Sequence, residues 1–111
     1  MNCMSFYDLY AIEAESLAAA KSLVEALLSC SFEERDSSFH GGTYYHGGED
    51  SAESYMLKVN RDPFENEPAE SDFPHITFLL YVNDTTQSAE LQKAMAKGGF
   101  AVSLLRHEDL S

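Results

Sequence analysis

Histidine offers this chain its most direct route to chemistry, because an imidazole nitrogen binds metals and exchanges protons near neutral pH. The chain has four histidines, and His40 and His46 stand six positions apart among glycines. On one continuous strand these two would share a face, but the glycine pair at 41–42 predicts a break between them. No cysteine or acid stands at a spacing that completes a three-ligand set. We therefore interpret the histidines as surface or packing residues and expect no metal and no other cofactor.

Other arrangements that support catalysis are incomplete. The triplet His40-Gly41-Gly42 has the composition of a lipase oxyanion loop, but the GxSxG turn that would supply a nucleophile is missing. The glycine pairs lack both the Lys-Ser/Thr of a phosphate loop and the strand-to-helix setting of a dinucleotide fingerprint. The acid pairs Glu33-Glu34 and Glu49-Asp50 fall on an expected edge strand and an expected loop, where carboxylates are normally solvated. The sequence thus predicts no catalytic residue and favours a protein that is not an enzyme.

Negative charge is the dominant property of the chain, since 19 acids against 7 lysines and arginines leave a formal net charge of −12. Such a surface repels nucleic acid and anionic membranes and favours a basic partner. The acids concentrate between Ser31 and His75 and alternate there with aromatic residues. Acids that steer a partner and aromatics that anchor it are typical of a docking surface. The candidate partner-binding residues are Asp62, Phe64, Glu65, Glu67, Glu70, Asp72, Glu33, Glu34, Asp36, Tyr44 and Tyr45.

The aromatic residues between Ser31 and His75 can also be interpreted as core residues, not as anchors of a docking surface. Alternation along a strand buries about half of its side chains. The rings would then belong to the core, and the acids would be their solvated neighbours. The sequence leaves the two interpretations open.

The element that must position these residues is the apolar run 75–82, which turn-forming residues bound on both sides. Its length and composition predict an interior strand. Ile76, Phe78, Leu80 and Val82 fall on one face, which we expect to carry the helices. The face with His75, Thr77, Leu79 and Tyr81 is only half apolar, and we expect it to stay open to solvent or a partner.

The remaining elements follow from periodicity and end signals. An i, i+3, i+4 stripe predicts a helix at 16–29 with Ser16 or Glu15 near its N-cap. We expect Asp8 to face water, Asp84 to cap the second helix, and Gly98 to end that helix in the left-handed conformation. Residues 62–72 contain two prolines, five acids and no base, which predicts a long loop. The expected strands are 5–13, 44–46 paired with 53–61, the central strand, and 100–106, with the second helix at 86–97. The polar segment 31–37 is compatible with a further strand, which its charges would place at the edge of the sheet.

Strand-helix-strand units at both ends of this order predict an α+β fold in one domain, 1–111. The expected architecture is a ferredoxin-like open-faced sandwich, with two helices on one face of a mainly antiparallel four- or five-stranded sheet. Another open α+β arrangement with a different strand order is the alternative. The expected core residues are Leu23, Leu27, Leu91, Met95, Ile76, Phe78 and Leu80.

Composition indicates a folded cytoplasmic protein. The chain has 111 residues, of which 44% are hydrophobic, enough for one core. No apolar run approaches the ~20 residues of a membrane span, and the N-terminus lacks the pattern of a signal peptide. Cys3 and Cys30 have no CxxC spacing and are expected to be reduced thiols.

A small, acidic, single-domain α/β chain with no catalytic set resembles the immunity proteins of bacterial polymorphic toxin systems, including contact-dependent growth inhibition. The resemblance is one of type over the whole chain, and it transfers no residue role because these proteins share no motif. It implies a cognate basic toxin domain as partner, often a nuclease. An acidic surface suits such a toxin because the toxin's cleft is shaped to receive phosphates.

Two other classes of function remain open. One is a small ligand-binding or enzymatic domain whose pocket lies on the second sheet face and uses Tyr81, His75 and Thr77. The other is a regulatory module that dimerises through that face or through paired edge strands. A ligand retained on purification would favour the former, and a salt-insensitive dimer would favour the latter.

Overall fold

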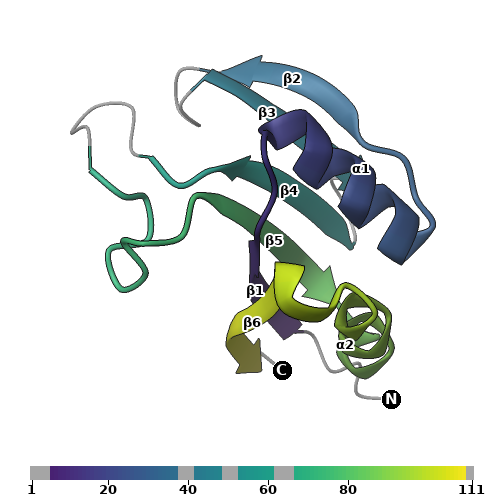
Figure 1. Cartoon of the computed structure of the whole chain (residues 1–111). Helices are drawn as coiled ribbons and strands as arrows, with labels where there is room; N and C mark the ends of the chain where they lie inside the picture. The colour runs from purple at the N-terminus through teal and green to yellow at the C-terminus, as the bar shows by residue number, and fades with distance from the viewer. Residues whose placement is uncertain (1–5, 38–41, 49–52, 62–66, 110–111) are drawn as a thin grey trace.

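One antiparallel sheet and two α-helices form the part of the chain that the computed structural model describes, residues 6–37, 42–48, 53–61 and 67–109 (Figure 1). A short 3₁₀ turn, η2, links the second helix to the last strand. The elements are β1 (Phe6–Ile12), α1 (Leu17–Leu28), β2 (Glu33–Ser37), β3 (Gly42–Gly48), β4 (Ser54–Val59), β5 (Phe78–Thr85), α2 (Ser88–Ala96), η2 (Gly99–Ala101) and β6 (Val102–Asp109).

The strands lie in the order β2-β3-β4-β5-β1-β6, and every neighbouring pair is antiparallel. This arrangement confirms the predicted α+β class with a mainly antiparallel sheet. The sheet has six strands among the described residues, not the predicted four or five. The count is higher because the polar segment at β2 and both strands of the β3–β4 hairpin all join it. β2 lies at one edge, as its charged sequence predicts.

β5 is an interior strand, as predicted, but it begins three residues later than the apolar run. Phe73 N donates to Glu70 O at 3.0 Å, and Ile76 N donates to Phe73 O at 3.2 Å. These turn-like hydrogen bonds hold the residues before Phe78 outside the ladder, so apolar composition alone overestimates the strand at this end. The predicted alternation is confirmed from Phe78 onward, since Phe78, Leu80 and Val82 enter the helix-side core.

Helix α1 has the predicted N-cap, because Ser16 Oγ accepts a hydrogen bond from Ala19 N at 3.1 Å. The predicted cap of α2 was wrong. Asp84 belongs to β5 and has a φ of 55°, in the left-handed region, whereas Gln87 precedes the helix and donates its N–H to Thr85 Oγ1 at 3.1 Å. The predicted stop was also misplaced by one residue.

Gly98 has an ordinary right-handed φ of −75°, and Gly99 takes the left-handed value of 62°. A Cβ on Gly98 would stand 2.6 Å from Val102 Cγ2. Glycine at 98 therefore serves close packing between the end of α2 and β6, while Gly99 makes the turn.

The helix-side core agrees with most of the predicted core residues. Leu91, Met95, Phe78 and Leu80 are buried in it, and Leu23 and Leu27 pack against it while partly exposed. Ile76 is only partly buried and lies outside this core, because it precedes β5. The buried core residues are Tyr10, Ile12, Ala20, Val24, Phe32, Tyr45, Tyr55, Leu57, Phe78, Leu80, Val82, Leu91 and Met95.

The predicted start of the last strand at Phe100 was wrong. Its side chain is 100% exposed in η2, and β6 begins only at Val102. A 3₁₀ turn has no strand alternation, so the strand starts two residues later than the sequence suggests.

Candidate functional site

The second face of the sheet is covered, although the sequence predicted an open one. Leu79 pairs with Ala11 on β1 and with Lys58 on β4, and Leu9 pairs with Tyr81, so all five side chains share this face. Leu9, Ala11, Lys58 and Leu79 are each less than 7% exposed. Figure 1 shows the helices on one side of the sheet and the connection from β4 to β5 away from them.

One carboxylate attaches this connection to two strands of the second face. Glu70 accepts hydrogen bonds from Tyr81 Oη at 2.6 Å and from Arg106 Nη1 at 3.0 Å. Arg106 Nε also pairs with Glu108 at 3.0 Å. Burial, followed by the hydrogen bond to Glu70, raises the pKa of Tyr81. The side chain of Glu70 is only 17% exposed, so it joins the connection to the sheet and differs from the exposed acids around it.

Asn60, just beyond the end of β4, organises the backbone of the same connection. Its Nδ2 donates to Phe73 O and to Ile76 O, both at 2.9 Å, and its Oδ1 accepts from Glu70 N at 2.9 Å. Its own N–H donates to Thr77 O at 2.8 Å. One side chain therefore satisfies three backbone groups of residues 70–76, which lack the partners that a strand would give them.

The predicted partner-binding acids occupy different settings. Glu67 and Asp72 are exposed on the connection, and Glu33, Glu34 and Asp36 are exposed along the edge strand β2. Asp62, Phe64 and Glu65 lie outside the described residues. The structure thus places the exposed described acids of this set on two segments, the connection and the sheet edge.

The two predicted aromatic anchors differ from each other. Tyr44 is half-buried. Tyr45 belongs to the helix-side core, where Lys21 Nζ lies 5.5 Å from its ring centroid and its hydroxyl is 3.4 Å from Glu34 Oε1. The alternative interpretation of the aromatics, that they are core, therefore holds for Tyr45.

A polar cluster around the buried Asp8, which the sequence did not predict, joins β1, α2 and β6. Asp8 was expected to face water, but it is 2% exposed. Ser88 Oγ donates to Asp8 Oδ2 at 2.6 Å, His107 Nδ1 lies 2.5 Å from Asp8 Oδ1, and Gln92 Nε2 donates to Ser88 Oγ at 3.0 Å. A buried carboxylate requires such partners, and they come from residues 80 and 99 positions away.

This cluster contains Ser, His and Asp but is not arranged as a hydrolytic triad. In a triad the histidine lies between the other two residues and takes the proton of the serine. Here the Ser88 hydroxyl binds the carboxylate of Asp8 directly, and the same His107 nitrogen faces both residues, 3.3 Å from Ser88 Oγ. The cluster therefore joins three elements and lacks the Asp-His-Ser order of a triad.

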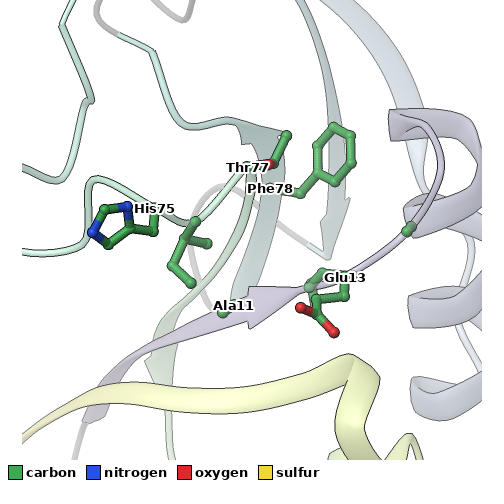
Figure 2. A pocket seen from close by; sticks show the side chains of 8 residues that line it. Ala11, Glu13, His75, Thr77 and Phe78 are labelled. Carbon is green, nitrogen blue, oxygen red and sulfur yellow. The ribbon is translucent and has the colours of Figure 1, made fainter.

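A cavity of about 330 Å³ lies where β1 ends and β5 begins. Figure 2 shows Glu13 and His75 on opposite sides of it in this view, with the imidazole of His75 turned away from Glu13. Both titratable side chains are exposed. The lining residues are Ala11, Ile12, Glu13, Ala14, His75, Ile76, Thr77 and Phe78.

The three residues expected to line a ligand pocket, His75, Thr77 and Tyr81, do not share one cavity. His75 and Thr77 line the large cavity, whereas Tyr81 lines a smaller one of about 120 Å³ with Arg106 and Asn83. The two sites are separate because β5 starts after Thr77, so the alternation that would align all three residues does not extend to His75.

In the described part of the chain, no group of three or more His, Cys, Asp and Glu side chains is arranged to hold a metal ion. His40 lies outside that part. Cys30 is a free thiol, and burial, followed by the charges of Glu25 and Glu53, raises its pKa. Neither described α-helix is long and apolar enough to cross a membrane.

Comparison with protein-family models and with curated proteins found no match to this chain.

Proposed function

We propose that this protein is a stoichiometric inhibitor that binds a basic protein domain, and that it acts as a cytoplasmic immunity protein for a bacterial toxin of the contact-dependent growth inhibition type. The partner would be a toxin domain with a phosphate-binding cleft, such as a nuclease, and no catalysis by this chain is required. The observation that most supports this proposal is a net charge of −12 with exposed carboxylates on two separate segments.

The arrangement of these carboxylates supports binding to a protein. Glu70 and Asn60 hold the connection in place through hydrogen bonds to Tyr81, Arg106 and the backbone. Glu67 and Asp72 are therefore presented on a segment that is ordered before a partner arrives. Such preorganisation lowers the entropic cost of association, and the charges speed the encounter with a basic surface.

We also propose that the fold is the ferredoxin-like arrangement with an added hairpin. Without β2 and β3, the elements follow the chain order β-α-β-β-α-β, which is the order of that fold. The added hairpin forms the edge of the sheet and carries Glu33, Glu34 and Asp36.

The test is capture of the partner from the source cells by the tagged full chain, followed by titration of the purified pair at low and high salt. We expect a basic protein, a 1:1 complex and protection of cells that co-express both chains. The variant Glu67→Gln/Asp72→Asn, with Glu70 kept, should bind at least about tenfold more weakly at low salt and lose less at high salt. Glu90→Gln, on α2, is the control for loss of one exposed acid.

Capture of no basic protein would contradict the proposal. A complex whose affinity is the same in the folded variant and the wild type at both salt concentrations would remove the connection from the interface.

The second candidate function is a ligand-binding domain, which the 330 Å³ cavity beside His75 and Thr77 favours. A small molecule that stays bound to the purified protein and is lost in Thr77→Val would support this function over inhibition of a toxin.

A further inference from the structure

The cavity at the end of β1 is lined by three exposed polar side chains, Glu13, His75 and Thr77. Within the described part of the chain, the side chains of Glu13, His75 and Thr77 make no hydrogen bond or ion pair with one another or with other residues. The backbone of Glu13 is fixed, because its N–H donates to Ala101 O at 2.8 Å. The main chain of Glu13 is therefore held beside the cavity, and its exposed carboxylate remains available to a ligand.

The cavity walls restrict the chemistry of that ligand. Its formal charge comes from Glu13 alone when His75 is neutral, and the whole protein carries −12, so a cation is favoured over an anion. A bound metal ion would need further ligands, and the described residues offer no group of three. Ala11, Ile76 and Phe78 supply apolar wall, which suits a cation that carries an alkyl chain.

Arginine matches these requirements better than lysine. Its guanidinium is planar and binds a carboxylate through two parallel hydrogen bonds, and its methylene chain can lie along apolar wall. Arginine is also enriched among the residues that dominate binding energy at protein interfaces. Glu15, exposed two residues further along the chain, adds negative potential on the approach.

We propose that this cavity binds an arginine side chain of the partner protein, with Glu13 pairing the guanidinium and the apolar wall holding its methylene chain. This inference rests on the proposed function for the identity of the partner, but the cavity's preference for a guanidinium can be measured without that partner.

The probe is N-acetyl-L-arginine amide, titrated into the ¹⁵N-labelled full chain and followed by NMR. Its matched control is N-acetyl-L-citrulline amide, which has nearly the same shape and no charge. We expect saturable shifts at residues 11–14 and 75–78, with a Kd on the order of 1–10 mM for one side chain. The citrulline compound should bind at least about tenfold more weakly, because the charge-assisted pair with Glu13 is lost.

Two variants decide whether Glu13 is responsible. Glu13→Gln should lower the affinity for the arginine compound to that of citrulline, whereas Glu90→Gln should retain the wild-type affinity. Glu90 is also an exposed acid, in the first turn of α2, which follows the opposite end of β5. Equal shifts from both compounds, shifts confined to other residues, or unchanged binding in folded Glu13→Gln would overturn the inference.

The same variants separate this inference from the proposed function. A captured basic partner that binds Glu13→Gln as well as wild type would refute the arginine site and leave the inhibitor function standing. Binding of the arginine compound at Glu13 together with capture of no basic protein would leave a cation site without the proposed partner.

Discussion

The two faces of the sheet are covered by different physical means. On one face, α1 and α2 pack apolar side chains such as Val24, Met95 and Leu80 into a continuous core. On the other face, the connection from β4 to β5 is attached through Glu70 and Asn60, and its described residues 67–77 form no helix or strand. Both faces bury leucine completely, since Leu79 and Leu80 are each 0% exposed, so burial alone does not distinguish them.

The two faces differ in the kind of interaction that holds the covering segment on the sheet. Apolar packing is non-directional and spread over many contacts, and a helix keeps its own backbone hydrogen bonds. The connection depends on a few directional hydrogen bonds, and losing one of them frees a backbone segment. We therefore expect the helix side to determine global stability and the connection to open locally at a lower free energy.

The largest expected loss of stability comes from a cavity on either face of the sheet. Leu79 and Leu80 are neighbours in β5 whose side chains point to opposite faces, so each can be shortened to alanine separately. Leu80→Ala should lower the free energy of unfolding by about 4 kcal/mol, and Leu79→Ala by about 2–3 kcal/mol, because the irregular cover can relax further into the space. Urea unfolding of both variants measures the two values. A loss below about 0.5 kcal/mol for Leu79→Ala, the scale of a surface change, would mean that the second face is open.

Asn60→Ala tests the hydrogen bonds of the connection. It removes three bonds to backbone groups, each contributing about 0.5–1.5 kcal/mol, and should lower stability by about 2 kcal/mol in the same urea experiment. Asn83→Ala, half-buried on β5, is the matched control and should cost less than about 0.5 kcal/mol. Equal losses in the two variants would show that Asn60 has no special role in closing the second face.

Alkaline pH should weaken the helix side through Tyr10. Burial, followed by the negative charge of Asp8, raises the pKa of this buried tyrosine above its ordinary value of 10.0. The unfolded chain therefore loses the proton first, and stability that is complete below pH 10 declines as the pH rises toward the folded-state pKa. The decline approaches about 1.4 kcal/mol per pH unit for one such group.

Unfolding measured between pH 8 and 11 tests this slope. Tyr10→Phe should remove the part due to Tyr10, whereas Tyr7→Phe, at an exposed tyrosine, should leave it. A slope that is the same in wild type and Tyr10→Phe would assign the alkaline loss to other groups.

The smallest effect has the opposite sign and occurs at neutral pH. Tyr10 Oη is buried without a hydrogen-bond partner among the described residues, which is unfavourable for a hydroxyl. Tyr10→Phe should therefore raise the free energy of unfolding by about 1 kcal/mol at pH 7. A loss of more than about 1 kcal/mol would indicate that the hydroxyl has a partner in solution.

The sequence predicted the core on the helix-covered face of the sheet, because its residues recur at the spacing of a helix stripe or a strand face. The stripe of α1 and the alternation of Phe78, Leu80 and Val82 each identify a buried face from sequence spacing alone. Ser16 was predictable as a cap because the bond that it accepts comes from Ala19, three residues away. The polar sequence of β2 likewise indicated an edge.

Contacts distant in sequence were not predictable from such patterns. Asp8 is polar and suggested a solvent-facing position, but its partners are Ser88 and His107. The sequence around Glu70 does not distinguish it from the other acids of its loop. Its partner Arg106 lies 36 residues away in the chain, so local spacing could not identify this ion pair. Asp84 does not cap α2 because β5 continues to Thr85, and the residue that precedes α2 is Gln87.

Amide hydrogen exchange of the wild-type protein tests most directly whether an ordered connection closes the second face. Glu70, Phe73 and Ile76 donate their N–H groups to Asn60 Oδ1, Glu70 O and Phe73 O. We predict that these three amides exchange at least about tenfold more slowly than the exposed Ser71 and Asp72 between them. The protection should be lost in Asn60→Ala while β5 stays protected. Exchange of all five amides at the rate of an unstructured peptide would contradict the account.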